Sequence, residues 1–324
     1  MQERKAMAPL PDMQAVTEIA RRFDTAKAAD PALENAELGE LLRLVPGRRA
    51  LAEGLLDGRD AVFRFHLGGP PAAQAREWAE LQRIWPLMRD GACRVVEPLH
   101  FNGDHGVMVV SRVSGTPLLQ HLWKIDPARR AAILGPAARW LRQYTEVSEV
   151  WRPAKPGAWL SRAERASAKQ PFRRLARIEA GILNELHRLA RLMGKADWRC
   201  AIGHGDFHPN NLILRGERLT GIDTGGSAVM PVYKDMARFL VHMGRRGMIP
   251  SGRSYLGVDA DGIAAFGDVF SLSRSETGLH LPFMIGCETL LRVETRKLKR
   301  GRIRHAEAMS QALLRDLREA GRDF

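Results

Sequence analysis

The stretch that decides the fold is Ile202-Gly-His-Gly-Asp-Phe-His-Pro-Asn-Asn-Leu-Ile-Leu214. It brings a histidine, a carboxylate and a carboxamide close together in the sequence, at His204, Asp206 and Asn211. After Asn211, the run Leu219-Thr-Gly-Ile-Asp223-Thr-Gly-Gly supplies a second carboxylate. This order predicts a loop, a short strand, a turn and a second strand, with Asp206, Asn211 and Asp223 at one end of the hairpin.

Oxygen ligands of this kind suit a hard cation such as Mg²⁺, which keeps several waters and takes phosphate oxygens. Phosphoryl transfer needs such a metal and an Asp that orients the attacking hydroxyl. The spacing therefore favours a phosphotransferase over the simpler interpretation, in which Asp206 and Asn211 cap a turn and Asp223 ends a strand.

The motif H-G-D-F-H-P-N-N-L-I with a downstream I-D-x-G resembles the signature of the aminoglycoside phosphotransferase and choline kinase group, relatives of protein kinases. The segment Pro231-Val-Tyr-Lys-Asp235-Met-Ala is similar to the family's stretch in which a second Asp braces the active site. The resemblance covers roughly residues 40 to 245. It implies an α+β, protein-kinase-like fold of two lobes, with a small mixed β-lobe containing one helix before a larger, mainly helical lobe.

By this resemblance, Asp206 is the catalytic Asp that accepts or orients the proton of the acceptor hydroxyl. Asn211 and Asp223 are expected to hold Mg²⁺, and ATP is the expected donor. His204 is placed with the catalytic residues as the histidine that supports the loop, and His208 is expected to pack or brace the loop.

The same residues are compatible with two other chemistries. His204, Asp206 and His208 form an H-x-D-x-H array that could ligate zinc in a metallohydrolase, but the other eight histidines lack ligand spacing. Asp223-Thr-Gly resembles the D-T-G of aspartic proteases, whose chemistry needs a second such carboxylate. The chain contains no second D-[ST]-G, so both alternatives are disfavoured.

The first part of the chain predicts strands and two helices. A helix is expected over 13–29, followed by strands at 41–45, 49–56, 60–66, 94–101 and 106–113 and a helix over 72–88. Asp57-Gly58 predicts a tight hairpin. From residue 127 the pattern changes to long helices, expected over 127–150, 159–193, 232–243, 263–273 and 279–299, with a last one ending near 320. The predicted domains are an N-terminal helical extension (1–39), a nucleotide-binding β-lobe (40–113) and a helical catalytic and acceptor-binding lobe (114–324).

The β-lobe should bind the nucleotide. Gly47 and Arg48 lie between the first two expected strands, where backbone N–H groups could meet phosphate. Arg64 takes the strand position at which protein kinases carry Lys, and a guanidinium still binds phosphate in a bidentate way. The resemblance pairs Arg64 with Glu77, and Glu80 is the near alternative.

Val107-Met-Val-Val-Ser-Arg-Val113, followed by Ser114-Gly, resembles the last strand of the β-lobe and the hinge. Backbone groups at Ser111 and Val113 are therefore expected to bind adenine.

Length, cysteine content and hydropathy exclude several classes of protein. The chain has 324 residues, 45% of them hydrophobic and 27% charged, which is ordinary globular composition. Three widely spaced cysteines favour free thiols over a disulfide framework or a Cys-type zinc site. No apolar run of about 18 residues and no signal-peptide pattern appears, so we expect a cytoplasmic protein.

The formal charge of +13 is unevenly distributed. Residues 1–113 carry 15 basic and 16 acidic residues, whereas 114–324 carry 35 and 21, so the excess lies in the helical lobe. Its densest stretch, from Arg292 to Arg304, has seven basic residues and one acidic residue. No nucleic-acid motif accompanies it, so nucleic acid is not an expected partner. Peripheral contact with an anionic membrane surface remains an alternative.

The positive charge of the helical lobe indicates which kind of small-molecule hydroxyl acceptor the protein binds. A lobe of net +14 should disfavour a polycationic aminoglycoside and favour an anionic or sugar-type acceptor, such as a sugar phosphate, a sugar acid or a lipopolysaccharide core at the membrane surface. Asp268, Glu276 and Glu288 could still form a local acidic cleft. A pseudokinase or nucleotide-binding regulatory module is the alternative from another class, and Arg64 in place of Lys is its only support.

Overall fold

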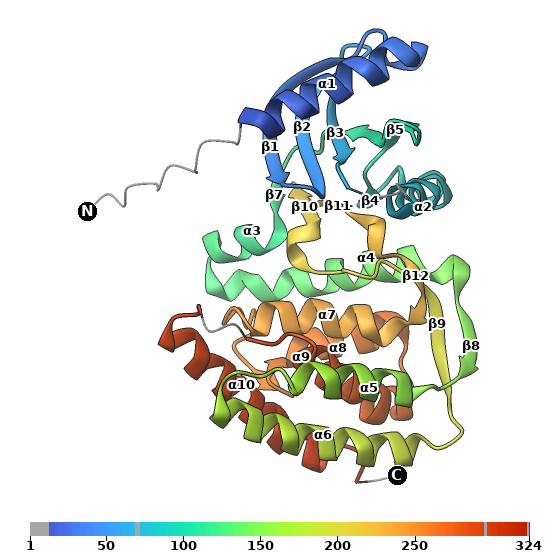
Figure 1. Ribbon diagram of the computed structural model, residues 1–324. Helices are drawn as coiled ribbons and strands as arrows, with labels where there is room; N and C mark the ends of the chain where they lie inside the picture. Colours follow the sequence, from blue (N-terminus) through green and yellow to red (C-terminus); the bar gives the residue numbers. More distant parts are fainter. Residues whose placement is uncertain (1–12, 69–71, 295–296, 323) are drawn as a thin grey trace. The chain divides into compact units, whose positions relative to one another are not determined.

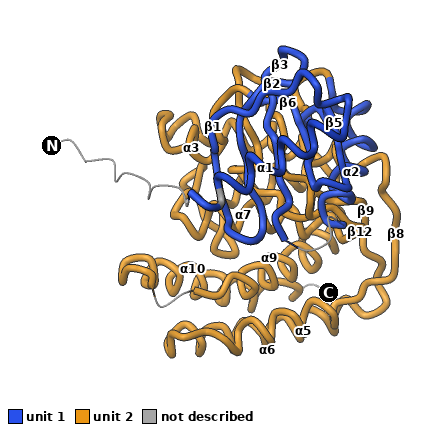
Figure 2. Tube along the Cα trace, turned by 45° about the horizontal axis from the view of Figure 1, so that its top comes forward, with its two compact units in different colours: residues 1–89, 95–113 blue, residues 90–94, 114–324 orange. Residues whose placement is uncertain are grey.

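The computed structural model describes residues 13–68, 72–294, 297–322 and 324. These residues form two compact units (Figure 2). Unit 1 takes the described residues of 1–89 and 95–113, and unit 2 takes those of 90–94 and 114–324. The described part of the N-terminal segment 1–39 therefore belongs to the same unit as the strands that follow it.

Unit 1 is built on a five-stranded antiparallel sheet in the order β1-β2-β3-β6-β5. The strands are β1 (Glu37–Val45), β2 (Arg49–Leu56), β3 (Arg59–His66), β5 (Pro98–Asn102) and β6 (Val107–Ser111), and α2 (Ala72–Met88) follows β3. The strand expected over 94–101 is divided into β4 (Cys93–Val95) and β5, and β4 joins a different sheet. The division coincides with Pro98, which has no N–H to continue a ladder.

The hairpin predicted at Asp57-Gly58 is confirmed. Both residues have positive φ, 50° and 73°, and the flanking Leu56 and Arg59 are paired across the strands. Two central residues in this conformation match the right-handed twist of the strands that they connect.

Helix α1 (Met13–Ala29) lies along one face of the unit 1 sheet (Figure 1). Its Ile19, Phe23 and Ala26 are buried in one cluster with Phe63 of β3. The rings of Phe23 and Phe63 meet edge to face at 5.5 Å. Because burying one large apolar side chain is worth about 1.5–3 kcal/mol, this face of α1 is an integral part of the core.

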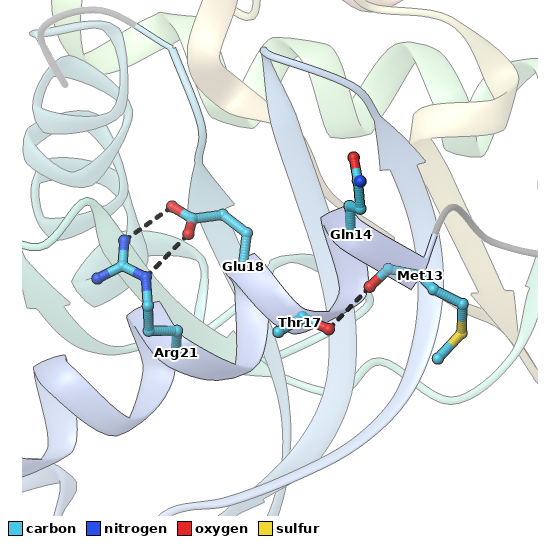
Figure 3. A pocket seen from close by; sticks show the side chains of 5 residues that line it. All are labelled: Met13, Gln14, Thr17, Glu18 and Arg21. Atoms are coloured by element: carbon cyan, nitrogen blue, oxygen red, sulfur yellow. Dashed lines mark hydrogen bonds and ion pairs between the residues drawn. The ribbon is translucent and has the colours of Figure 1, made fainter.

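The exposed face of α1 carries polar contacts within the helix (Figure 3). Thr17 donates a hydrogen bond to the carbonyl of Met13 at 2.9 Å, and Arg21 Nε donates to Glu18 at 2.9 Å. Pairs of this kind contribute about 0.2–0.5 kcal/mol each, so they add little to the apolar packing. Arg22 and Lys27 also join α1 to the rest of unit 1 by donating to the carbonyls of His66 and Ala36 at 3.0 Å and 2.8 Å.

Unit 2 is mainly helical, as predicted. Its helices are α3 (Leu118–Lys124), α4 (Leu134–Thr145), α5 (Pro156–Ser167), α6 (Arg173–Met193), α7 (Val232–Gly244), α8 (Ala260–Phe270), α9 (Leu281–Leu290) and α10 (Arg300–Glu319). Helix α6 packs against α5 and α10 (Figure 1). Helix α7 is buried along its whole length, so its polar residues require a specific reason to be there.

Three of the predicted helices differ from those observed. The helix expected over 159–193 is two helices, because Pro171 cannot continue a helical hydrogen-bond ladder and disfavours the helical conformation of the residue before it. The helix expected over 127–150 begins with a 3₁₀ segment, Pro127–Ile133, and α4 ends at Thr145. The helix expected over 279–299 ends at Leu290, and part of that range, 295–296, lies outside the described residues.

A four-stranded sheet of unit 2, in the order β4-β11-β10-β7, contains the predicted hairpin of β10 (Leu212–Arg215) and β11 (Arg218–Gly221) next to β7 (Thr116–Pro117). A three-stranded sheet, which the sequence pattern did not predict, joins β8 (Val150–Pro153), β9 (Asp197–Gly203) and β12 (Ala228–Pro231). Within the described ranges, no helix is both long and apolar enough to span a bilayer.

Candidate active site

The loop that carries Asp206 begins where β9 ends, at Gly203, and its backbone is tightly constrained. Gly205 has φ of 81°, and a Cβ atom added to it would lie 1.9 Å from the carbonyl oxygen of Gly226. Only glycine fits a position that combines this conformation with such a close approach. The conformation of the loop therefore depends on the packing of Gly205 against the segment that follows Asp223.

Two side chains of α7 hold the same loop. Gly205 donates its N–H to Asp235 Oδ2 at 3.1 Å, and the Lys234 ammonium donates to the Gly205 carbonyl. Asp235 is 1% exposed and lies 3.2 Å from Lys234 Nζ. This is the bracing contact that the resemblance implied for Asp235.

Asp206 is held from both sides by cationic or polar groups. Arg238 Nε lies 2.8 Å from Oδ1, and His208 Nε2 lies 3.4 Å from Oδ2. Burial alone would raise the pKa of Asp206, but the hydrogen bond from His208 and the charge of Arg238 together hold this pKa well below its usual range. The carboxylate is therefore ionised at neutral pH, and 43% of its side chain remains exposed.

His204 is fully buried and links the two halves of the site. Its Nε2 lies 3.0 Å from the carbonyl oxygen of Ile222, next to Asp223, and its Nδ1 is 3.4 Å from the backbone N of Asp206. Burial lowers the pKa of His204, so the ring is neutral, with Nε2 as donor and Nδ1 as acceptor. The geometry indicates a residue that positions both acidic groups.

Asn211 and Asp223 lie at the same end of the β10–β11 hairpin. The N–H of Ile222 donates to the Asn211 carbonyl at 3.0 Å, and Leu212 is paired with Gly221. The Asn211 amide nitrogen donates to the backbone carbonyl of Asp206 at 3.0 Å. The structure thus brings together the three residues that the sequence predicted to meet.

The donor atoms suit Mg²⁺ better than zinc. Asp223 and Asn211 offer oxygen atoms, and a site with two such ligands leaves positions for water and phosphate oxygens, as Mg²⁺ prefers. Across residues 13–68, 72–294, 297–322 and 324, no group of three or more His, Cys, Asp or Glu side chains is arranged to hold a metal ion. The carbonyl contact of His204 and the stacking of His208 on His242, with ring centroids 4.2 Å apart, show other uses for the histidines of the H-x-D-x-H array.

In unit 1, the Arg64 guanidinium forms an ion pair with Glu77, and the two side chains are 15% and 6% exposed. Gln74 adds a hydrogen bond from its amide to the Arg64 carbonyl at 2.7 Å. Glu80, the alternative partner, instead pairs with Arg83 at 2.7 Å. The ion pair of Arg64 with Glu77 that the resemblance implied is therefore present.

The other predicted nucleotide-binding residues also lie in unit 1. Gly47 has φ of 65° in the turn between β1 and β2, and Arg48 donates its N–H to the Val45 carbonyl at 3.0 Å. Ser111 is the last residue of β6 and donates its N–H to the Glu97 carbonyl at 2.9 Å. Val113 is the last residue of unit 1.

Two of the three residues considered for an acidic cleft are neutralised by arginine. Glu276 is buried and lies 2.9 Å from Arg199, and it also accepts a hydrogen bond from Tyr233 at 2.8 Å. Glu288 is buried and accepts from Arg292 at 2.7 Å. Only Asp268 is exposed.

The sequence did not predict the contacts of Arg238 and His242 at this site, and it offered Glu288 only for an acidic cleft, not as a partner of Arg238. A signal was available for the first two: Asp235, Arg238 and His242 are spaced by three and four residues, which places them on one face of α7. Glu288 gave no such signal, because its contact with Arg238 joins helices that are distant in sequence.

A sheet unit followed by a mainly helical unit, with an Asp, an Asn and a second Asp gathered at a hairpin, defines a kinase-like phosphotransferase. The family model described as "Phosphotransferase enzyme family" matches residues 51–261, and the chain belongs to that family. Membership confirms the recognised resemblance and the predicted enzyme class, a phosphotransferase that uses an alcohol group as acceptor.

Solved structures share the fold at low sequence identity. Aminoglycoside phosphotransferase APH(4)-Ia is 14% identical, with a TM-score of 0.58 over 94% of this chain and 99% of that one. Choline kinase LicA from Streptococcus pneumoniae is 13% identical, with a TM-score of 0.52 over 92% and 99%. Amicoumacin kinase hAmiN, solved with AMP-PNP, Ca²⁺ and its ligand, is 12% identical, with a TM-score of 0.53 over 92% and 96%. These similarities confirm the kinase-like fold. A comparison with curated proteins gives no match.

Proposed function

We propose that this chain transfers the γ-phosphate of ATP to a hydroxyl of a small molecule in a Mg²⁺-dependent reaction. The observation that carries the proposal is the joint anchoring of Asp206, Asn211 and Asp223. His204 contacts the backbone beside both acidic residues, and Asn211 donates to the Asp206 carbonyl. A structural turn needs no such convergence of three potential reaction groups.

Asp206 is the group that receives the acceptor hydroxyl. Its low pKa makes it a weak base, so it orients the hydroxyl toward phosphorus and takes the proton late, as the loose transition state of phosphoryl transfer allows. Arg238 and His208 each engage one carboxylate oxygen, which restricts rotation of the side chain. His204 is a positioning residue, because it contacts the loop backbone.

Asn211 and Asp223 would hold Mg²⁺, which when bound neutralises charge on the transferring phosphate. In unit 1, Arg64 supplies the cation for the ATP phosphates, and Glu77 orients it. Gly47 contributes phosphate-facing backbone and Arg48 its side chain, because the N–H of Arg48 is engaged by the Val45 carbonyl. Backbone groups at Ser111 and Val113 bind adenine, apart from the Ser111 N–H, which donates to the Glu97 carbonyl. The buried Arg64–Glu77 pair supports an active enzyme over a pseudokinase, since the arginine makes the contact expected of the lysine that it replaces.

The acceptor is anionic or sugar-type. The neutralised state of Glu276 and Glu288 supports this assignment, because these carboxylates are already engaged by Arg199 and Arg292 and offer little to a polycation.

The test is an ATP-consumption screen with sugar phosphates, sugar acids, amino alcohols and aminoglycosides. Asp206→Asn should lower kcat by about 10²–10⁴-fold, because its amide cannot accept the proton. Asp268→Asn, an exposed position on α8, is the matched control and should retain wild-type turnover. Equal turnover by wild-type protein and Asp206→Asn would contradict the proposal.

A further inference from the structure

A group of arginines extends outward from Asp206 within unit 2. Its members come from α7 and its C-terminal end, from the segment after α9 and from the first turn of α10. We refer to these residues as the arginine cluster: Arg238, Arg245, Arg246, Arg292 and Arg302.

The inner part of the arginine cluster is connected to the candidate catalytic carboxylate. Arg238 Nε lies 2.8 Å from Asp206 Oδ1 and 3.6 Å from Glu288 Oε1. The same Glu288 oxygen accepts from Arg292 Nη2 at 2.7 Å. A continuous row of alternating charges therefore leads from Asp206 to Arg292.

Arg245 joins the row at its outer end. It donates to the backbone carbonyl of Arg292 and lies 2.5 Å from Glu294. Burial lowers the pKa of Arg245, and the charges of Arg292 and Arg238 lower it further, against the opposing effect of Glu294.

The rim of the cluster is formed by Arg246 and Arg302, which are exposed and, within the described part of the chain, form no ion pair. The end of α7 and the start of α10, which carry them, are in contact, because His305 Nε2 lies 2.7 Å from the carbonyl oxygen of Gly244. Arg246 donates to the carbonyl of His242 at 3.0 Å, a contact with no formal charge. Burial and then the charges of Arg238, Arg245 and Arg302 lower the pKa of Arg246 against a smaller opposing effect of Glu294, so positive charge prevails around this guanidinium. An anion placed among them would relieve that repulsion.

We propose that the arginine cluster is the acceptor-binding site and that it binds a phosphate or carboxylate group of the acceptor. This inference rests on the proposed function and deepens it. The anionic group binds at the exposed Arg246 and Arg302, and the hydroxyl to be phosphorylated reaches the exposed part of Asp206. Arginine suits this role because its planar fork binds either oxyanion in a bidentate way. An amine in the same place would meet like charges.

The experiment is a calorimetric titration, without nucleotide, of four sugars that share one scaffold: glucose phosphate, glucuronate, glucose and glucosamine. The two anionic sugars should bind about tenfold or more tightly than glucose, and glucosamine should bind most weakly. The double variant Arg246→Glu/Arg302→Glu should lose this preference by a similar factor. Arg318→Glu, an exposed arginine on the same helix as Arg302, is the matched control and should preserve it.

Equal binding of charged and neutral sugars, or a preference that survives the double variant, would overturn the inference. So would a wild-type protein that ignores soluble anionic sugars but binds vesicles of phosphatidylcholine and phosphatidylserine through Arg246 and Arg302, because the arginine cluster would then be a membrane contact. The proposed function fails separately: anionic sugars would bind as expected, yet no acceptor would support Asp206-dependent consumption of ATP.

Discussion

Arg238 holds Asp206 in place although 32 residues separate them in the sequence, with Arg238 Nε 2.8 Å from Asp206 Oδ1. The arginine side chain is 10% exposed, whereas that of Asp206 is 43% exposed. A buried cation thus fixes one oxygen of a carboxylate that remains accessible to substrate. Burial on one side and access on the other are what a residue that orients a substrate hydroxyl requires.

Two substitutions of Arg238 should distinguish the effect of its positive charge from the effect of its guanidinium geometry. Arg238→Lys keeps the charge but loses the planar fork that reaches both Asp206 and Glu288, and we expect kcat to fall about tenfold. Arg238→Ala also leaves Glu288 with Arg292 as its remaining cation, and the free energy of unfolding should fall by about 1–3 kcal/mol. Steady-state kinetics and urea unfolding measure these effects. Adding Glu288→Ala to Arg238→Ala should recover part of the stability; no recovery would show that the two residues are not coupled.

The conformation of the loop should depend on Gly205. In Gly205→Ala the new Cβ would collide with the Gly226 carbonyl at a position with φ of 81°, so we expect severe loss of activity and a melting temperature lower by several degrees. Gly216→Ala is the matched control. It has φ of 59° but nothing within 4 Å of the added Cβ, so it tests the backbone strain alone and should cost about 1 kcal/mol. Similar losses in the two variants would show that the close approach to Gly226 is unimportant.

The Arg64–Glu77 pair should behave as a buried ion pair. Arg64→Met leaves the 6%-exposed Glu77 side chain without its cation and should cost about 3–5 kcal/mol in unfolding free energy. The double variant Arg64→Met/Glu77→Leu should cost less than Arg64→Met alone, because no uncompensated charge remains. Denaturant unfolding of the three proteins checks this order. In a separate assay, Arg64→Lys should keep the KM for ATP nearer to the wild-type value than Arg64→Met does.

His242 should make stability fall in mildly acidic solution. Burial, and after it the neighbouring His208, Arg246 and Arg238, lower the pKa of His242 to about 2, against 6.5 for the unperturbed side chain. Below pH 6.5 the His242 side chain therefore binds a proton in the unfolded chain but not in the folded chain. The contribution of His242 to the free energy of unfolding is complete above that pH and declines below it. By about pH 5 the loss from this residue is about 2 kcal/mol.

His242→Phe keeps a ring that can stack on His208 and has no titratable nitrogen. The difference in unfolding free energy between about pH 7.5 and pH 5 should be smaller in this variant than in the wild type by about 2 kcal/mol. His187→Gln, at an exposed position, is the control and should retain the full wild-type difference. An unchanged pH dependence in His242→Phe would refute the assignment.

Local signals in the sequence were sufficient for much of the fold. Asp57-Gly58 predicts its hairpin because the positive φ values belong to those two residues and need no distant partner. The same holds for the β10–β11 hairpin, which brings Asn211 and Asp223 together. Pro171 was an equally local signal, but the regular spacing of apolar residues on both sides of it suggested one long helix.

Other features depend on contacts that sequence spacing does not encode. Strand β9 pairs with β8 and β12, which are both distant from it in the sequence. Cys200 of β9, for example, is paired with Val150 on one side and with Pro231 on the other. Glu288 contacts Arg238 only because α9 packs against α7. The residues of the candidate chemistry were therefore predictable as a motif, whereas the side chains that orient them were not.

Strand β12 and helix α7 have a consequence for the order in which the protein becomes active. A ribosome that has translated residues up to Gly226 has already made Asp206, Asn211 and Asp223. Strand β12, one of the two strands that pair with β9, and the helix that supplies Asp235 and Arg238 are still to be synthesised. Because folding of this region waits for contacts from later segments, a nascent chain released at this point would carry the whole motif and yet lack an ordered site.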